Sequence, residues 1–380
     1  YFYKDGGEPD TAGELLIQSA LADTLERIAH DGPDGFYKGK TAELIADEMK
    51  RGGGLIDAKS LAAYRAVDRK PASGTYRGYE VVTMAPPSSG GVHILQMLNI
   101  LEHFPVAEFG AGGADSIHLL AEVARLAYAD RSEHLGDPDY YDVPVEWLIS
   151  KEYGKELAAT IDMRAARKST DVASGVAPRP ESPDTTHFSV VDAAGNIVAT
   201  TTTLNFSFGS AISVPGAGFL LNNEMDDFVS KPGVPNAYGL LGGKANAIAA
   251  GKRPLSSMTP TIVLADGQPW FATGSPGGSR IITSVLQMIV NVIDHGMNLA
   301  EAVNAPRMHH QWFPDVLQLE SGFSPDTVTI LRERGHAIEE SRWSMGSIQA
   351  VGIRDGVFRG ASDPRRPNAA SVAPAAAAAE

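Results

Sequence analysis

The chain has 380 residues, of which 43% are apolar and 21% are charged, so it can bury a large core and does not belong to the disordered class. Asp and Glu outnumber Lys and Arg by 46 to 32, and the resulting net charge of −14 disfavours nucleic acid and anionic lipid as partners. Cysteine is absent, which excludes disulfides, thiolate nucleophiles, thiolate zinc sites and iron–sulfur clusters.

The sequence has no apolar run of the ~18 residues that a membrane-spanning helix needs, and its start at Tyr1 has no signal-peptide pattern. It also lacks an initiator Met. We therefore expect a part of a longer product, with any targeting segment upstream.

The first half is predicted to be mostly helical. Thr11 and Glu14 have capping-box spacing before apolar residues at helical intervals, which predicts a helix over about 12–29. The same periodicity, with Gly and Pro at the breaks, predicts the following elements: helices over 41–51, 94–101 and 114–132 and a strand over 76–84.

Periodicity disappears over 164–184, where Ser, Pro, Ala and charged residues predict an exposed linker. After it, 186–191 alternates and 197–204 is rich in Thr and Val, which predicts a β-hairpin. We divide the chain at this point into two segments, 1–184 and 185–380.

Strands and helices then mix, and the region from 366, most clearly its Ala-rich end, is predicted to be a disordered tail. Helical layers covering a mainly antiparallel sheet indicate an α+β fold. The remaining predicted elements are strands over 217–222, 260–265, 269–273, 316–320, 347–353 and 357–360 and helices over 281–290 and 325–334.

Standard catalytic and metal-binding motifs do not occur. There is no His-Glu-x-x-His and no phosphate-binding loop, and the Ser275 segment lacks nucleophile-elbow spacing. His309 and His310 are adjacent, so their rings point apart and a structural role is the better interpretation. We expect no metal and no organic cofactor.

The junction of Asp184 and Thr185 is a candidate catalytic feature, because a polar linker there runs directly into a strand. If the peptide bond between them is cut, the hydroxyl of Thr185 becomes a nucleophile beside its own α-amine, whose ordinary pKa of about 7.7 to 8.0 suits a general base. The alternative is an ordinary threonine at a strand start, which the residues alone favour.

Five segments closely resemble the γ-glutamyltranspeptidase family, in one order along the chain: 185–192, 203–205, 221–228, 252–258 and 273–279. By this resemblance, 1–184 corresponds to the later part of the family's large subunit and 185 to about 365 to its small subunit. The family implies the αββα four-layer fold of N-terminal-nucleophile hydrolases, with the earlier part of the large subunit upstream of Tyr1.

The resemblance also implies catalytic roles. Thr185 corresponds to the nucleophile, which its own attack on the Asp184 carbonyl releases, and Thr203 to the residue that orients its hydroxyl. Gly277 and Gly278 correspond to the oxyanion hole, where glycine allows backbone N–H groups to approach a developing negative charge.

Substrate-binding residues are implied in the same way. A γ-glutamyl group carries an α-ammonium and an α-carboxylate, so both signs of polarity are needed. The implied ammonium contacts are Asn205, Glu224 and Asp227, the carboxylate contacts are Ser256 and Ser257, and Tyr238 is the closing residue of a lid over 232–240. The family's main carboxylate-binding Arg lies upstream, and neither Arg179 nor Arg253 is assigned to that role.

The implied activity is γ-glutamyl transfer from glutathione or related amides to water or to amino-acid or peptide acceptors. The implied assembly is a heterodimer of large and small subunits from one precursor, periplasmic or secreted. Two alternatives stay open: a cephalosporin or glutaryl acylase of the same fold, and a truncated, non-catalytic homologue.

Overall fold

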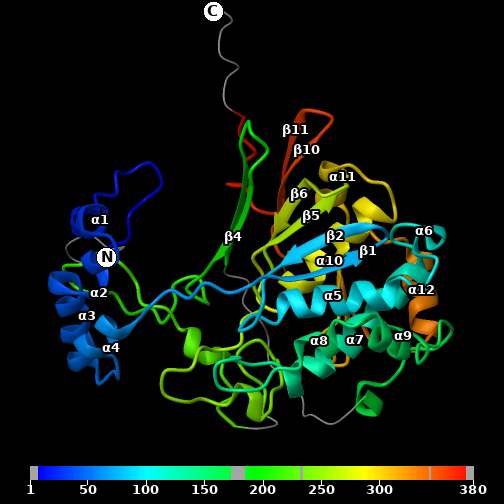
Figure 1. Ribbon diagram of the computed structural model, residues 1–380, viewed down its shortest axis with the longest axis horizontal. Coiled ribbons are helices and arrows are strands. Elements are labelled where there is room, and N and C mark those ends of the chain that lie inside the picture. Colours follow the sequence, from blue (N-terminus) through cyan, green and yellow to red (C-terminus); the bar gives the residue numbers. More distant parts are fainter. Residues whose placement is uncertain (1–6, 173–184, 232–233, 342–343, 374–380) are drawn as a thin grey trace, which may run out of the picture. The chain divides into compact units, whose positions relative to one another are not determined.

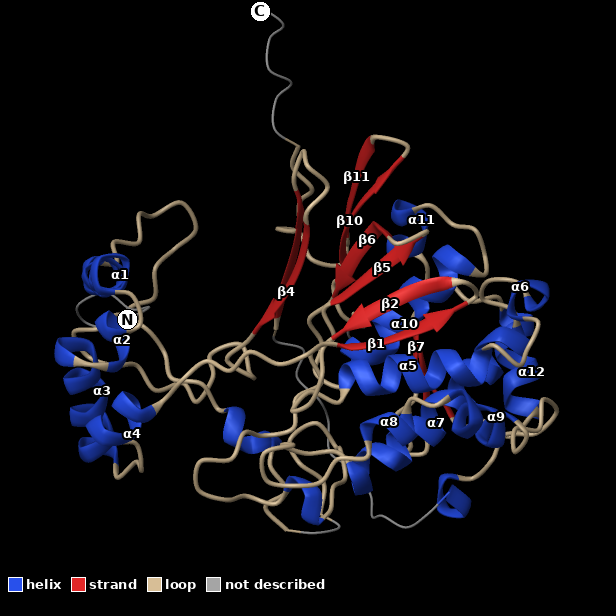
Figure 2. Ribbon diagram, viewed as in Figure 1, coloured by secondary structure: helices blue, strands red, loops and turns tan. Residues whose placement is uncertain are grey.

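The computed structural model describes residues 7–172, 185–231, 234–341 and 344–373. The chain forms two compact units, both drawn in Figures 1 and 2. The small unit comprises 1–69 and 208–223, and the main unit comprises 70–207 and 224–380. The predicted division into 1–184 and 185–380 marks a cleavage point and does not coincide with the boundary between these units. It stays a prediction.

The small unit consists of short helices and the 208–223 segment. Ala42 and Ile45 are buried in one apolar cluster with Val214 and Ala217, so residues far apart in the sequence share this core. The helices are α1 (Ser19–Asp31), α2 (Asp34–Tyr37), α3 (Gly39–Gly52) and α4 (Ala58–Ala63).

In this unit one prediction is wrong at its start and another is wrong altogether. The helix predicted from residue 12 begins only at Ser19, and Thr11 and Glu14 instead close an isolated turn in which Gly13 has a φ of +96°. The strand predicted over 217–222 does not form, because the backbone at Gly218 turns with a φ of +77°. Such positive φ values interrupt regular helices and strands.

The main unit is built on a six-stranded antiparallel sheet with the order β1-β2-β5-β6-β10-β11. The strand predicted over 76–84 is instead part of a hairpin, since Arg77 and Gly78 turn the chain with positive φ values. The strands are β1 (Ala72–Tyr76), β2 (Tyr79–Thr83), β5 (Thr261–Ala265), β6 (Gln268–Gly274), β10 (Gln349–Arg354) and β11 (Val357–Ser362). The last four were predicted.

Apolar helices cover one face of this sheet (Figure 2). α5 (Gly90–Leu101) packs on β1 and β2, α10 (Arg280–Ile293) packs on β6, and α7 (Ala114–His134) packs on α5. Every residue of α5 is buried, as expected for a helix between a sheet and a second helix. All three helices were predicted.

A β-hairpin packs on the opposite face. β3 (Thr186–Val191) pairs with β4 (Ile197–Thr202), as predicted, and the hairpin contacts β5, β6 and β10. Along β6, Phe271 belongs to the helix-covered core, whereas Gly274 lies against the ring of His187. Since strand residues three apart point to opposite faces, the sheet lies between the helices and the hairpin.

The remaining elements complete the main unit. β7 (Met308–His309), β8 (Leu317–Leu319) and β9 (Ile338–Glu340) form a small sheet. The short helices are α6 (Val106–Phe109), α8 (Val145–Leu148), α9 (Lys151–Ala158), η1 (Ser169–Val172), η2 (Glu224–Asp227), η3 (Lys244–Asn246), α11 (Leu299–Asn304) and α12 (Pro325–Glu333).

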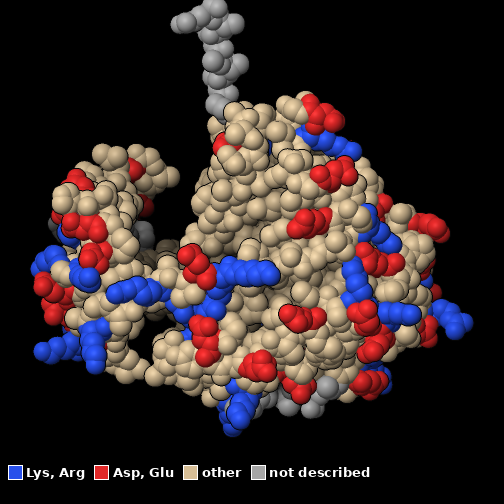
Figure 3. All heavy atoms as spheres, viewed as in Figure 1, with Lys and Arg blue, Asp and Glu red and all other residues tan. Residues whose placement is uncertain are grey.

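Two surface properties bear on partners. No helix within the described ranges combines the length and the hydropathy that crossing a bilayer requires. On the face drawn in Figure 3, acidic and basic side chains are interspersed, so the net charge of −14 is not gathered there into one patch.

The contact between hairpin and sheet gives a first prediction. A Cβ added at Gly274 would lie 2.3 Å from ring atoms of His187, so we expect Gly274→Ala to lower the free energy of unfolding by about 1–3 kcal/mol. Gly243→Ala is the matched control in the same unit, because its Cβ would meet only Ser132 at an ordinary 3.5 Å. Urea denaturation of both variants measures the difference. Equal midpoints would contradict the packing.

Candidate active site

The predicted nucleophile and its orienting residue lie side by side. Thr185 directly precedes β3 and is buried, and Thr203 directly follows β4. Their hydroxyl oxygens are 3.3 Å apart, within hydrogen-bond distance. The hairpin register pairs Thr186 with Thr202, so the two threonines continue the same ladder by one position. Asp184 lies outside the described residues.

Asn205 and Tyr238 extend this group. The backbone N–H of Asn205 donates to the hydroxyl oxygen of Thr203 at 2.8 Å, and the Asn205 backbone has a φ of +75°. Asn tolerates this left-handed conformation better than most residues. The Tyr238 hydroxyl donates to the Asn205 backbone oxygen at 3.2 Å and to its side-chain oxygen. The aromatic residue of the predicted lid therefore holds the segment that follows Thr203.

The glycine turn lies under the Tyr238 ring. Gly277 and Gly278 connect β6 to α10 with φ values of +135° and +56°. A Cβ on Gly278 would lie 2.6 Å from the Tyr238 ring, so only glycine fits against this tyrosine. Among the described residues, neither glycine N–H donates to an acceptor, and both precede the first turn of α10. Such N–H groups can stabilise an oxyanion.

The predicted ammonium contacts lie on η2. Glu224 and Asp227 are half-buried at the two ends of this single turn. Burial raises the pKa of Glu224 to about 7, and burial together with the Glu224 charge raises the pKa of Asp227 to about 8. Two poorly solvated carboxyl groups close together would be stabilised by a bound cation.

The predicted carboxylate contacts are adjacent to this acidic turn. The Asn246 side chain donates to the Asp227 backbone oxygen at 2.7 Å and accepts from the Leu255 N–H at 3.1 Å, which ties η2 to the serine segment. The Ser256 hydroxyl accepts from the Met258 N–H at 3.0 Å. The Ser257 hydroxyl accepts from the guanidinium of Arg131 at 3.3 Å.

Helix α7 connects the two groups of residues. The Tyr128 hydroxyl donates to the Ser279 backbone oxygen at 2.5 Å, directly after the glycine turn, and Arg131 contacts Ser257 one helical turn further on. On the other side, the Gln311 side chain accepts from the Ser279 hydroxyl and donates to the Tyr238 backbone oxygen.

Four of these connecting residues, Tyr128, Arg131, Asn246 and Gln311, were missed from the sequence. Each makes its connecting hydrogen bond to a residue more than 8 positions away in the sequence, which local patterns do not indicate. A polar residue within a predicted buried helix, as at Tyr128 and Arg131, was the available signal.

A cavity of about 820 Å³ opens beside Thr185. Thr185, Pro276, strands β10 and β11 and part of 366–373 line it. The glycine turn, the acidic turn and the serine pair are not among the residues that line this cavity. Thr185 is thus linked to the cavity directly and to Gly278 through Thr203, Asn205 and Tyr238.

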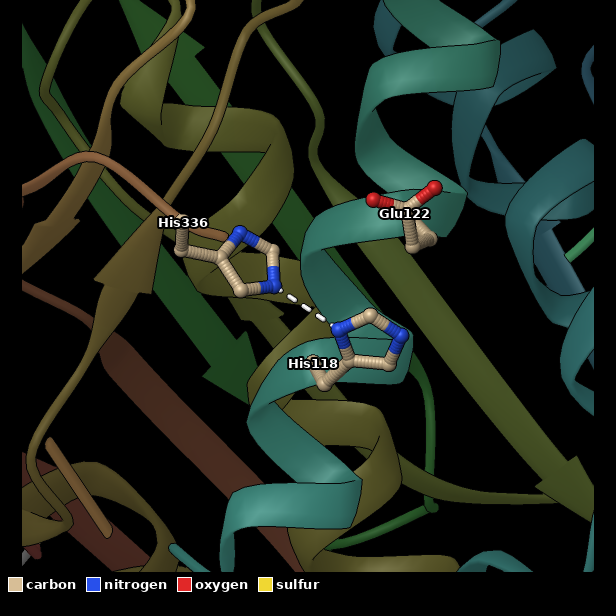
Figure 4. Close-up of side chains that lie close together, drawn as sticks. All are labelled: His118, Glu122 and His336. Carbon is tan, nitrogen blue, oxygen red and sulfur yellow. Dashed lines mark hydrogen bonds between the residues drawn. The ribbon is translucent and has the colours of Figure 1, made fainter. Parts of the chain in front are cut away.

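His118, Glu122 and His336 also cluster, with ligand atoms within 4.8 Å of one another. Figure 4 shows the two imidazole rings pointing toward each other, with Nδ1 of His118 2.8 Å from Nε2 of His336. Nε2 of His118 contacts the Asp162 backbone oxygen, and Glu122 is paired with Arg125. The facing guanidinium disfavours a bound cation, so we interpret the cluster as structural.

The adjacent histidines have separate partners, as expected from the sequence. His309 contacts Thr283 and Gln311, whereas His310 contacts Arg125 and Asp315. Burial lowers the pKa of His309 to about 3 and that of His310 to about 4, so both rings are neutral at physiological pH.

Comparisons with known proteins point to one family. The family model described as Gamma-glutamyltranspeptidase matches residues 1–373. The chain is 56% identical to the glutathione hydrolase proenzyme of Escherichia coli (strain K12), over 96% of this chain and 63% of that protein. It is 44% identical to the Acylase ACY 1 proenzyme of Pseudomonas sp. (strain SE83), over 94% of this chain and 61% of that protein.

A solved structure extends the comparison to the fold. The cephalosporin acylase from Bacillus halodurans matches with a TM-score of 0.81 at 28% identity, over 94% of this chain and 63% of that chain. This similarity confirms the predicted α+β, four-layer αββα fold class of the N-terminal-nucleophile hydrolases. The chain spans less than two thirds of the length of these relatives.

The raised pKa of Asp227 gives a second prediction. The ordinary pKa of an Asp is 3.8, and that of folded Asp227 is about 8. At a pH between these values, the folded protein retains a proton on Asp227 that the unfolded chain releases. This group therefore lowers the free energy of unfolding as the pH rises through the interval. Asp227→Asn cannot ionise, and its melting temperature should fall less than that of the parent between pH 5 and pH 8.

Asp226→Asn is the matched control, because it removes an exposed carboxyl from the same turn. Calorimetry at both pH values measures the two variants. Identical pH dependence in Asp227→Asn and the parent would show that Asp227 is not held in a poorly solvated position.

Proposed function

Because the chain belongs to the γ-glutamyltranspeptidase family, we propose that it transfers γ-glutamyl groups from glutathione and related amides to water or to amino-acid or peptide acceptors. The observation that carries this proposal is the pair of threonine hydroxyls 3.3 Å apart, connected through Asn205 and Tyr238 to the glycine turn. This arrangement supports a threonine nucleophile near two backbone N–H donors.

The acyl-transfer step uses the two groups of a freed Thr185. Its hydroxyl oxygen attacks the γ-carbonyl carbon while its α-amine accepts the hydroxyl proton. The N–H groups of Gly277 and Gly278 stabilise the tetrahedral oxyanion, and the α-amine returns the proton to the departing nitrogen. Water or an acceptor amine then attacks the ester, with the proton again taken by the α-amine and returned to the threonine oxygen.

Maturation would use the same oxygen. The Thr185 hydroxyl attacks the Asp184 carbonyl, and the acyl group shifts to the oxygen as the C–N bond breaks, which frees the α-amine. Water then hydrolyses the ester, leaving a carboxylate on Asp184 and a free hydroxyl on Thr185. Two relatives carry proenzyme in their names, which supports a precursor that is cut into large and small subunits. We also propose a periplasmic or secreted location from the family resemblance.

Recognition of the γ-glutamyl group uses opposite polarities on neighbouring segments. Glu224 and Asp227, with Asn205, are proposed to bind the α-ammonium, since charge-assisted hydrogen bonds contribute about 1.5–3 kcal/mol each. Ser256 and Ser257 are proposed to bind the α-carboxylate. The segment containing Tyr238 is proposed as a lid that restricts water at the acyl-enzyme.

A second candidate is an acylase acting on cephalosporin-type or glutaryl amides. Two of the proteins compared above carry acylase in their names. A glutaryl group has no α-ammonium, so the acidic turn that carries Glu224 and Asp227 favours the γ-glutamyl substrate. Hydrolysis of γ-glutamyl and glutaryl anilides by the same preparation separates the two activities.

The nucleophile assignment gives a third prediction. Purified full-length protein should appear as two polypeptides, the second beginning at Thr185, whereas Thr185→Ala should stay uncut and lose at least about 1,000-fold in γ-glutamyl anilide hydrolysis. Thr185→Ser is the matched control and should still be cut, because it retains a hydroxyl. Gel electrophoresis and N-terminal sequencing report cleavage.

Cleavage of Thr185→Ala at the same bond would defeat this assignment. A cut parent that forms no acyl-enzyme adduct on Thr185 with a γ-glutamyl electrophile, as measured by intact mass, would favour the non-catalytic alternative.

A further inference from the structure

Arg131 is a buried cation beside the serine segment. The residue is 4% exposed, its Nε donates to the Ser89 hydroxyl at 3.0 Å, and its Nη2 donates to the Ser257 hydroxyl at 3.3 Å. No carboxylate in the described ranges comes within 4 Å of this guanidinium. Buried charges in proteins are usually paired, so it is unusual that the partners of Arg131 in the described part of the chain are hydroxyls.

A second buried arginine on the same helix provides the contrast. Arg125 is paired with Glu122 and lies 3.0 Å from Asp315, so its charge is compensated within the protein. The positive charge of Arg131 is not compensated in this way. It is therefore available to an anionic group that enters beside Ser257.

Arg131 also determines how Ser257 can hydrogen-bond. A serine hydroxyl has one hydrogen and two acceptor lone pairs, and here the oxygen accepts from Arg131. The hydroxyl hydrogen has no acceptor among the residues that the structure describes, so it can donate to a ligand. A guanidinium behind a donating hydroxyl is a suitable arrangement for a carboxylate.

The position of Arg131 relative to the acidic turn completes the pattern. Burial raises the pKa of Asp227, and the charge of Arg131 lowers it by a smaller amount. Asn246 joins the Asp227 turn to Leu255, two residues before Ser257. One guanidinium therefore acts on both the carboxylate-binding and the ammonium-binding sides of the site.

We propose that Arg131 is a specificity-determining positioning residue that selects substrates with an α-carboxylate, by orienting the Ser257 hydroxyl and by placing positive charge behind it. This role rests on the proposed γ-glutamyl activity and adds to it a protein cation for the carboxylate. Arg131 takes no part in bond making or breaking, so its loss should weaken binding more than turnover.

The test compares two substrates of the full-length protein: a γ-glutamyl anilide, and its analogue whose α-carboxylate is a neutral carboxamide. We expect Arg131→Met to raise KM for the γ-glutamyl anilide about 10- to 100-fold, the loss of one charge-assisted interaction, with kcat changed less than about threefold. KM for the carboxamide should change less than about twofold. Arg131→Lys keeps the charge and should give an intermediate, equally selective increase.

Arg125→Met is the matched control, because it removes the other buried guanidinium of α7 without touching Ser257. It should lower stability and affect both substrates equally. If Arg131→Met does not fold, the variants Arg131→Lys and Ser257→Ala test the proposal instead. The double variant should raise KM by less than the product of the two single effects, because the two residues act through one hydrogen bond.

Calorimetric binding of L-glutamate gives a readout that does not need turnover. We expect Arg131→Lys to weaken glutamate binding and to leave binding of its α-carboxamide analogue unchanged. A parent that binds glutamate through Arg131 but hydrolyses no γ-glutamyl anilide would refute the proposed function alone. An active parent whose Arg131 variants lose both substrates in equal proportion would overturn the role of Arg131.

Discussion

The burial of α7 is the constraint on which the site depends. This helix packs on α5, yet it carries Glu122, Arg125 and Arg131 in buried positions, and each must find partners away from water. Arg125 is satisfied by neighbouring carboxylates, whereas the partners of Arg131 within the described part of the chain are the hydroxyls of Ser89 and Ser257. A core helix thus places a buried positive charge beside the segment that carries Ser257.

The same helix connects the residues proposed for substrate recognition to those proposed for the acyl-transfer step. Tyr128 holds the backbone directly after the glycine turn, and Arg131 holds Ser257 one turn further along. Burial raises the pKa of both Glu224 and Asp227 in the acidic turn, and the charge of Arg131 acts on Asp227 in the opposite direction. If a zwitterionic γ-glutamyl group binds there as proposed, its charges would offset the unfavourable desolvation of both Arg131 and the acidic turn.

Local sequence signals predicted the parts of this arrangement that depend on local order. Alternation from Thr186 gave the hairpin, and apolar periodicity gave α7 and α10, because burial on one face dictates the pattern. The helix start at Ser19 was missed, since the capping-box residues close a separate turn. The hydrogen bond from Arg131 to Ser257 joins positions 126 apart in the sequence. No local pattern distinguishes a buried arginine with hydroxyl partners from one that is paired with a carboxylate.

The glycine turn and Tyr238 constrain each other. Gly278 has a φ of +56°, and any Cβ there would overlap the Tyr238 ring. The ring therefore packs directly against the glycine whose N–H is proposed to stabilise the oxyanion. The Tyr238 hydroxyl in turn holds Asn205, whose N–H fixes the Thr203 hydroxyl. Displacing the tyrosine would therefore disturb the glycine turn and the orientation of Thr185 together. It follows that Tyr238 couples the glycine turn to the Thr185–Thr203 pair through a chain of direct contacts.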